Sequence, residues 1–205
     1  MTDYEKISVA EFTEALASKT SVPGGGGASA LCASIGAALG DMVGEYTIGK
    51  KTYADVEEDI KVLMDKAQDL RKRLLDCINK DAIAFEPLSK AYSMDKSDPD
   101  RAIVMEKCLR DAAGVPFEIL QLACEAIDLQ RDFAAKGSKL MVSDAATGAA
   151  ILRGAMLGAA VNVKVNTHLM KDTMYATAIN ATVDALVEAY KEKADAIFDS
   201  VYAGF

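Results

Sequence analysis

The sequence of 205 residues has no Trp, a single His, four Pro and four Cys, and only 6% of it is aromatic. With few aromatic residues and abundant Ala, the composition favours closely packed helices over a β-sandwich. The single His168 excludes a His-rich metal site and argues against a Ser-His-Asp triad, so we expect no bound metal. The cysteines show neither a CxxC pair nor a metal-binding spacing, and their apolar surroundings predict buried free thiols. They are Cys32, Cys77, Cys108 and Cys124.

Positive charge is also scarce, because 23 Lys and Arg face 31 Asp and Glu and leave a net charge of −8. This balance argues against nucleic acid and anionic membrane surfaces as partners. The N-terminus shows no basic-then-apolar signal segment, and the uncharged run from Ala28 to Gly40 is shorter than the roughly 20 apolar residues of a membrane span. We therefore expect a cytoplasmic protein of a reducing compartment. A small anionic ligand is compatible with this charge, because a site needs only a few local cations.

No stretch shows the sustained alternation of a β-strand, so we predict an all-α protein with a single domain over residues 1–205. A capping box at Ser8 and Glu11 predicts a short first helix. The rest indicates a bundle of about six long helices, with kinks expected near Pro87 and Pro116. The expected long helices cover about 27–49, 52–92, a segment that follows a loop at 96–99, 143–171 and 176–202.

Small residues recur every four positions along two of these helices. In the second helix the stripe contains Gly36, Gly40 and Gly44, and three mid-helix glycines cost about 3 kcal/mol relative to Ala. Close approach of another backbone or of a flat ligand offsets such a cost. The stripe therefore predicts tight helix packing, within one chain or across a dimer. In the fifth helix Gly154 and Gly158 are followed at the same spacing by Asn162 and Asn166, which serve either as inter-helix hydrogen-bonding groups or as ligand contacts.

A carboxylate interrupts the apolar seam of the third helix. Asp81 occupies a position between Cys77 and Ala84 where the pattern calls for an apolar residue. A buried carboxylate costs several kcal/mol unless it is hydrogen-bonded, paired or protonated, and burial raises its pKa towards the range of an acid/base catalyst. Asp81 is therefore either a structural residue bonded to a backbone amide or a lysine, or a catalytic group.

Two further groups lie near helix ends. Ser143 and Asp144 stand where the fifth helix is expected to start, and they are either plain caps or part of a ligand site at that helix end. Lys50 and Lys51 follow the second helix and are either solvated or suited to a carboxylated tail. The stretch from Gly44 to Lys50 fits GxxxxGK, but Lys51 replaces the required Ser or Thr and no strand precedes it, so we reject a phosphate loop.

Taken together, the motifs resemble the cyclodeaminase/cyclohydrolase family of folate enzymes. The resemblance covers nearly the whole chain from about Pro23 onwards. Two departures stand out, because the family has Ser at the position of Gly27 and Asn at the position of Ser138. The stretches that carry the resemblance are PGGGGASA, GAALGDMVGEYTIGKK, DAIAF, AAGVPFEIL, GSKLMVSDAATGA and GAAVNVKVN.

This resemblance implies a tetrahydrofolate derivative as substrate, no cofactor, and a helical homodimer with the folate site near the subunit contact. The expected reaction is hydrolysis of 5,10-methenyltetrahydrofolate to 10-formyltetrahydrofolate, which needs a base for water and an acid for N5. Asp81 and Asp144 are the expected catalytic residues, with the roles of acid and base unassigned. The expected substrate-binding residues are Pro23, Gly24, Gly25, Gly26, Lys50, Ser143, Asn162 and Asn166.

Three other functions are compatible with the sequence. A formiminotetrahydrofolate cyclodeaminase would let N10 attack the formimino carbon and release ammonia, and it needs nearly the same site. A folate-binding module would bind the ligand without turnover. In a purely structural helical dimer, the glycine stripes would serve assembly alone. The sequence barely separates the first of these from the cyclohydrolase, which we take as the leading expectation.

Overall fold

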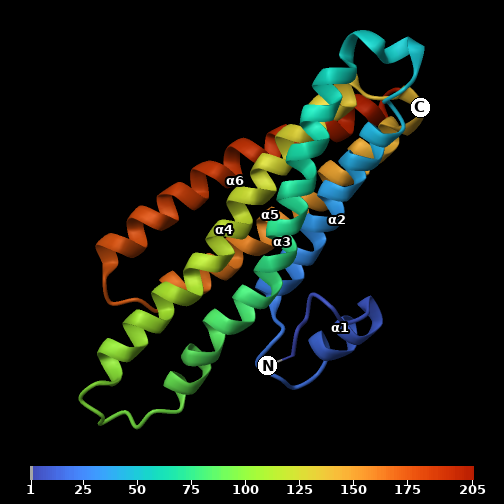
Figure 1. Cartoon of the computed structure of the whole chain (residues 1–205). Helices are drawn as coiled ribbons and strands as arrows, with labels where there is room; N and C mark the ends of the chain where they lie inside the picture. The colour runs from blue at the N-terminus through green and yellow to red at the C-terminus, as the bar shows by residue number, and fades with distance from the viewer. Residues whose placement is uncertain (1) are drawn as a thin grey trace.

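The computed structural model describes residues 2–205 and has four long helices packed as a bundle (Figure 1). These helices are α2 (Gly25–Glu45), α3 (Glu57–Tyr92), α4 (Arg101–Lys136) and α5 (Val142–Thr167). A further long helix, α6 (Thr173–Tyr202), packs along α5 and α4. The short α1 (Val9–Leu16) is set off from the bundle near the N-terminus. Two 3-10 turns, η1 (Lys51–Val56) and η2 (Lys139–Met141), complete the elements. The described residues contain no strand, and the all-α prediction is confirmed.

Helix boundaries follow local chemistry. The capping box of α1 is present, because the Ser8 hydroxyl accepts from the Glu11 N–H at 3.2 Å and the Glu11 carboxylate accepts from the Ser8 N–H at 2.8 Å. Helix α3 starts at Glu57, after the 3-10 turn η1, and not near residue 52 as predicted. Helix α2 begins at Gly25, earlier than predicted, and the Asp81 carboxylate accepts one N–H of its first turn.

The glycine stripe of α2 brings helices together within one chain. A Cβ built on Gly36 would lie 2.6 Å from the Leu152 side chain, and one on Gly40 would lie 2.7 Å from the Gln130 amide nitrogen. Such contacts leave no room for a methyl group, so the close packing offsets the low helix propensity of glycine. The prediction of tight helix packing is confirmed for this stripe.

Helices α2 and α5 run in opposite directions. The N-terminal Gly25 of α2 lies beside Asn162 in the C-terminal half of α5, whereas Gly36 lies beside Leu152. The start of α2 therefore meets the end of α5, next to the middle of α3. This meeting point holds most of the residues that the sequence singles out.

Three of the four cysteines are buried as predicted, but Cys32 is exposed. Cys32 lies one helical turn before Gly36, at the edge of the glycine face, and it is exposed together with Ile35. Helix α2 and the segment Lys139–Thr167 are long and apolar enough to span a membrane, with a mean hydropathy of 1.3 each. About half of each span is buried in the protein (56% and 50%), as also occurs in the core helices of soluble proteins.

Candidate functional site

Asp81 of α3 faces the first turn of α2. Its carboxylate accepts a hydrogen bond from the Gly27 N–H at 2.9 Å, which is one of the backbone donors that a helix start leaves without an internal partner. Burial raises the pKa of Asp81 to about 6, although the Gly27 hydrogen bond acts in the opposite direction. A carboxylate with this pKa exchanges protons readily near neutral pH.

The glycine run makes room for side chains from two other helices. A Cβ on Gly26 would overlap the Asp81 carboxylate, and a Cβ on Gly25 would lie 2.7 Å from the Asn162 amide nitrogen. Gly27 differs, because a Cβ there would meet Ile78 at an ordinary 3.8 Å. An alanine at position 25 or 26 would therefore displace the Asn162 amide or the Asp81 carboxylate, whereas a Cβ at position 27 fits.

A cavity of about 160 Å³ opens where α2, α3, α4 and α5 meet, and we call it the Asp81 cavity. It brings together six of the predicted site residues, namely Gly24, Gly25, Gly26, Asp81, Asn162 and Asn166. Pro23 is buried immediately before this segment. Sequence reasoning missed Phe85, Ala112, Pro116 and Val165, which also line the cavity. Phe85 lies one helical turn after Asp81, and this spacing predicts that both side chains lie on the same face of the helix.

The Asn166 side chain is held by a hydrogen bond to the Ala112 carbonyl, which Pro116 leaves without a helical donor. Pro116 lacks an N–H, so the Ala112 carbonyl four residues earlier has no helical donor. The Asn166 side-chain amide donates to this carbonyl at 3.1 Å and to the Asn162 carbonyl at 2.9 Å. Both of its N–H groups are thereby used, so the amide oxygen is what Asn166 has left for a ligand. Asn162 donates one N–H to the Gly158 carbonyl at 2.8 Å and keeps its second N–H and its oxygen.

The remaining predicted residues lie at the other end of the bundle. Asp144 and Ser143 are in the first turn of α5, and Asp144 precedes Asn162 by 18 residues, a separation of about 27 Å along the helix. Lys50 follows the end of α2, where its ammonium lies 3.4 Å from the Ser138 hydroxyl. A single chain therefore does not bring Asp144, Ser143 or Lys50 to the Asp81 cavity.

The Asp81 cavity offers one carboxylate, two side-chain amides and the N–H groups of a helix start. Gly25 and Gly26 have no preceding helical carbonyl to accept from their N–H groups. Such a set suits a planar ligand with several hydrogen-bonding groups and positive charge near Asp81. Within residues 2–205, His, Cys, Asp and Glu side chains form no group of three that could hold a metal ion.

The formiminotransferase-cyclodeaminase family profile matches residues 8–185 of the chain. A methenyltetrahydrofolate cyclohydrolase from Methylorubrum extorquens is 38% identical over 149 residues, which cover 71% of each chain. A formimidoyltransferase-cyclodeaminase from Dictyostelium discoideum is 34% identical over 57% of this chain, but the match covers only 22% of that longer protein. The corresponding mouse protein is 26% identical over 74% of this chain and 29% of its own length.

The fold also matches a solved structure. The crystal structure of formiminotetrahydrofolate cyclodeaminase from Thermotoga maritima superposes with a TM-score of 0.85. The match covers 97% of this chain and 98% of that protein at 24% identity. The bundle described above is therefore shared over its whole length.

Proposed function

This chain belongs to the formiminotransferase-cyclodeaminase family, and on that basis we propose that it hydrolyses 5,10-methenyltetrahydrofolate to 10-formyltetrahydrofolate. The observation that carries the proposal is the Asp81 carboxylate, which lies in a cavity beside the glycine run with its pKa raised to about 6. The similarity to a cyclohydrolase over 71% of both chains supports this reaction.

The reaction adds water to the bridging carbon between N5 and N10, which carries positive charge in the substrate. Asp81 accepts a proton from the attacking water as the new C–O bond forms, and a neutral carbinolamine results. Asp81 then returns that proton to N5 as the bond between N5 and the carbon breaks, while the carbinolamine hydroxyl loses its proton to solvent. One proton is released per turnover, and the carbon stays on N10 as a formyl group. The charge of the carboxylate also stabilises the cationic substrate before attack.

The other cavity groups orient the pterin ring. Asn166 can only accept, so it suits an N–H of the ring, whereas Asn162 can both donate and accept. The N–H groups of Gly25 and Gly26 suit a ring carbonyl or an oxygen of developing negative charge. No step requires a further cofactor or a metal ion.

We also propose a homodimer that completes the site. The Asp81 cavity holds about 160 Å³, less than the roughly 300 Å³ at the lower end of small-molecule sites. A two-fold axis across α2 and α5 would place the Lys50 and Asp144 end of one copy beside the Asp81 cavity of the other. In that arrangement Asp144 and Ser143 lie near the reacting carbon, and Lys50 faces the glutamate tail.

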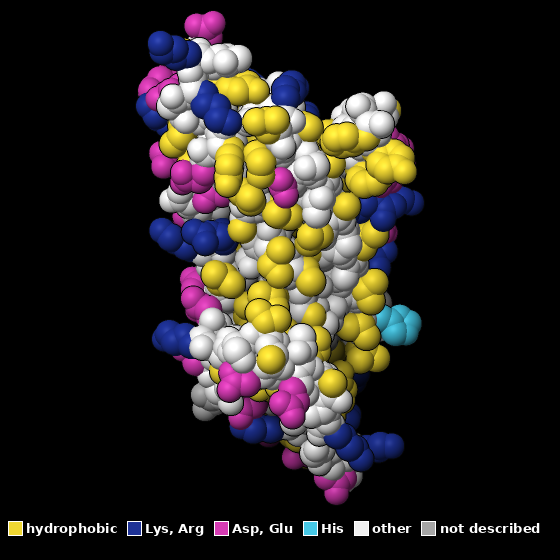
Figure 2. Space-filling model, turned by 90° about the vertical axis from the view of Figure 1, so that its right-hand side faces the viewer, with side chains coloured by type: hydrophobic (Ala, Val, Ile, Leu, Met, Phe, Trp, Pro, Cys, Tyr) yellow, Lys and Arg dark blue, Asp and Glu magenta, His cyan; other side chains and the backbone are white. Residues whose placement is uncertain are grey.

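The surface of α2 and α5 supports this arrangement. Ile35 and Met42 of α2 and Val161 and Val165 of α5 are 44%, 38%, 66% and 56% exposed. Figure 2 looks onto the side where α2 lies in Figure 1, and apolar side chains run along its middle between charged flanks. An apolar face of this extent on a soluble protein is typical of a subunit contact.

A second candidate function is formiminotetrahydrofolate cyclodeaminase. The names of the Dictyostelium discoideum and mouse relatives favour it. In this reaction N10 attacks the formimino carbon and ammonia leaves, so Asp81 would protonate the departing nitrogen. The product is the same methenyl bridge that the cyclohydrolase consumes.

One paired assay tests both candidates. Purified protein is incubated with 5,10-methenyltetrahydrofolate, and the loss of methenyl absorbance is followed after subtraction of hydrolysis by the buffer. A parallel reaction starts from 5-formiminotetrahydrofolate and follows the appearance of the same absorbance. Loss in the first reaction supports the cyclohydrolase, and gain in the second supports the cyclodeaminase. No change in either, with ligand-induced thermal stabilisation, would leave a folate-binding protein.

A further inference from the structure

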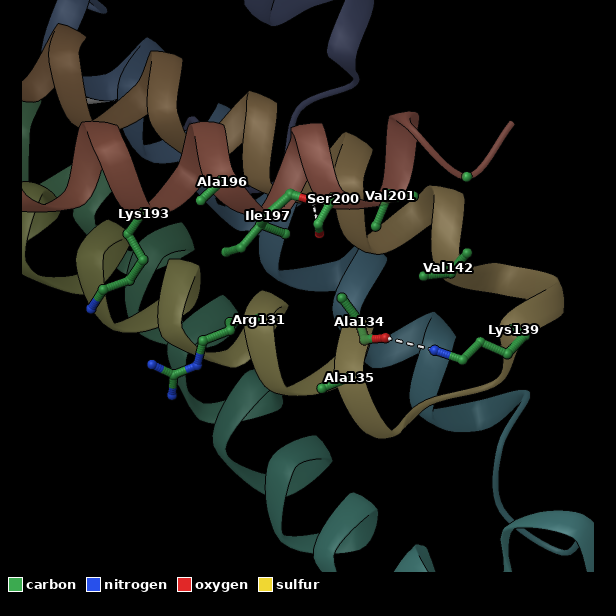
Figure 3. Close-up of a pocket in the computed structure, with 11 residues that line it drawn as sticks. Arg131, Ala134, Ala135, Lys139, Val142, Lys193, Ala196, Ile197, Ser200 and Val201 are labelled. Carbon is green, nitrogen blue, oxygen red and sulfur yellow. Dashed lines mark hydrogen bonds between the residues drawn. The ribbon is translucent and has the colours of Figure 1, made fainter.

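A second pocket lies at the C-terminal end of α4, away from the Asp81 cavity. Its walls come from the last turns of α4, the turn η2 with the start of α5, and the end of α6 (Figure 3). Ala134 of this pocket follows Pro116 of the Asp81 cavity by 18 residues on α4, which separates the two sites by about 27 Å. The volume is about 450 Å³, within the range of small-molecule sites. We call it the distal pocket.

The distal pocket combines an apolar floor with a cationic rim. The floor consists of small and branched side chains, namely Ala134, Ala135, Val142, Ala196, Ile197 and Val201. Arg131 and Lys193 lie on one side of it and Lys139 on the other (Figure 3), and no Asp or Glu is among the described lining residues. Such a surface contrasts with a chain whose net charge is −8. The lining therefore selects for an anion that also carries hydrocarbon.

The three cations are not equally available. Lys193 lies 2.6 Å from the Asp128 carboxylate, and Arg131 lies 3.0 Å from that of Asp132. Among the described residues Lys139 has no carboxylate within 4 Å, and its ammonium reaches only the Ala134 carbonyl at 3.5 Å. A ligand carboxylate therefore gains most beside Lys139.

The base of Lys139 is fixed by the fold. Its backbone N–H donates to the Tyr53 hydroxyl at 2.9 Å, and the preceding Ser138 N–H donates to the Thr47 hydroxyl at 2.8 Å. The side chain returns from this anchored turn over the end of α4 (Figure 3). The main chain from which the Lys139 side chain extends is thus set before any ligand arrives.

We propose that the distal pocket binds a small amphipathic carboxylate, with its carboxylate against Lys139 and its hydrocarbon body over Ala134, Ala135 and Ile197. The Ser200 hydroxyl, which donates to the Ile197 carbonyl at 2.9 Å, lies beside the body and can accept a further hydrogen bond. The pocket lies about 27 Å from the Asp81 cavity of its own chain, and its proposed ligand does not depend on the folate reaction.

The experiment uses octanoate as the probe and octan-1-ol as its uncharged match. Each is titrated into the full-length protein, and the methyl NMR signals of Ala134, Ala135 and Ile197 are followed. Lys139→Gln removes the anchoring charge, and Ala196→Trp fills the pocket from an exposed position of α6. Lys191→Gln, an exposed lysine on α6 outside the pocket, is the matched control.

We expect octanoate to shift the methyl NMR signals of Ala134, Ala135 and Ile197 in a saturable manner. Lys139→Gln and the exchange of octanoate for octan-1-ol each weaken binding about fivefold, the scale of one ion pair at a partly exposed site. Ala196→Trp abolishes binding, and Lys191→Gln leaves it unchanged. The proposal is overturned if octanoate leaves the pocket methyls unshifted, if octan-1-ol binds equally well, or if Lys139→Gln and Lys191→Gln behave alike.

Discussion

The side-chain amide of Asn166 donates to the main-chain carbonyl of Ala112 at 3.1 Å, and this bond joins α5 to α4 inside the Asp81 cavity. The carbonyl is available because Pro116 cannot donate the helical hydrogen bond that would otherwise occupy it. A proline inside a long helix is thereby linked to the orientation of a ligand-facing amide.

Replacing this proline tests the link. In Pro116→Ala the new N–H bonds the Ala112 carbonyl, so Asn166 loses an anchor and its orientation becomes variable. We expect kcat/KM for the methenyl substrate to fall about tenfold, the equivalent of one hydrogen bond. The helix itself should become more stable, because alanine is the better helix former.

Pro87→Ala is the matched control. Pro87 also lies inside a long helix, but it is exposed and outside the cavity. It should gain helix stability without a change in kcat/KM. Equal kinetics in the two variants would show that Pro116 has no positioning role.

Gly26→Ala tests the close approach of α2 and α3. The added methyl overlaps the Asp81 carboxylate, so we expect the carboxylate to move, activity to fall strongly, and unfolding free energy to drop by about 1–3 kcal/mol. Gly114→Ala adds the same methyl to an exposed position of α4 with no atom within 4 Å. The unfolding free energy of this control should rise by up to about 1 kcal/mol, and its activity should not change. Denaturant unfolding and the folate assay measure both effects, and a fully active Gly26→Ala would contradict the geometry.

Asp81 should lower stability at neutral pH while it serves the reaction. Its pKa is about 6 in the folded protein against an ordinary value of 3.8, so the folded state favours the protonated form. The stability that protonation brings is complete below about pH 4 and is lost as the pH rises through 6. We therefore expect Asp81→Asn to raise the unfolding free energy at pH 7.5 by about 1–3 kcal/mol.

The difference in unfolding free energy between Asp81→Asn and the wild type should shrink as the pH is lowered. At pH 4.5 the wild-type Asp81 is largely protonated when folded, so the wild type and the Asn variant converge. Unfolding curves at the two pH values provide the test. A variant that is less stable than the wild type at pH 7.5 would mean that the carboxylate has a structural role instead.

Mixed dimers test whether two copies share a site. Asp81→Asn and Asp144→Asn chains are co-expressed with different tags, and the mixed dimer is purified on both. If Asp81 of one copy works with Asp144 of the other, one of the two sites in each mixed dimer is intact, and about half of the wild-type activity returns. A mixed dimer as inactive as its parents would place both carboxylates in one chain. An active Asp144→Asn homodimer would remove Asp144 from the mechanism, and sedimentation as a monomer would exclude the dimer itself.

Local patterns predicted much of the fold and the core of the candidate site. Asp81 was found because it breaks an apolar seam, and the spacing of Asn162 and Asn166 placed them on one face of a helix. Both predictions depend only on helical periodicity. Tight packing of the glycine stripe follows from the same kind of argument, because mid-helix glycines need compensation.

Such local patterns do not predict contacts between segments that are far apart in the sequence. The sequence places Asp144 and Asn162 on one helix, 18 residues apart. It does not show which of them lies near Asp81, because that depends on which end of α5 meets the start of α2. The role of Pro116 was missed for the same reason. The Ala112 carbonyl that Pro116 leaves free accepts its hydrogen bond from Asn166, which lies on another helix. Cys32 was misjudged because apolar neighbours in sequence do not show which face of α2 is covered.

The most direct test is the buffer-corrected rate of 5,10-methenyltetrahydrofolate hydrolysis by the wild-type chain and by Asp81→Asn across pH 5 to 8. We expect the wild-type rate to fall as the pH drops through about 6, because the carboxylate must be ionised to accept a proton from water. We expect the rate of Asp81→Asn to be lower by about 100-fold or more while the variant remains folded. A variant that keeps the wild-type rate and the same pH profile would contradict the assignment of Asp81 as the proton-transferring group.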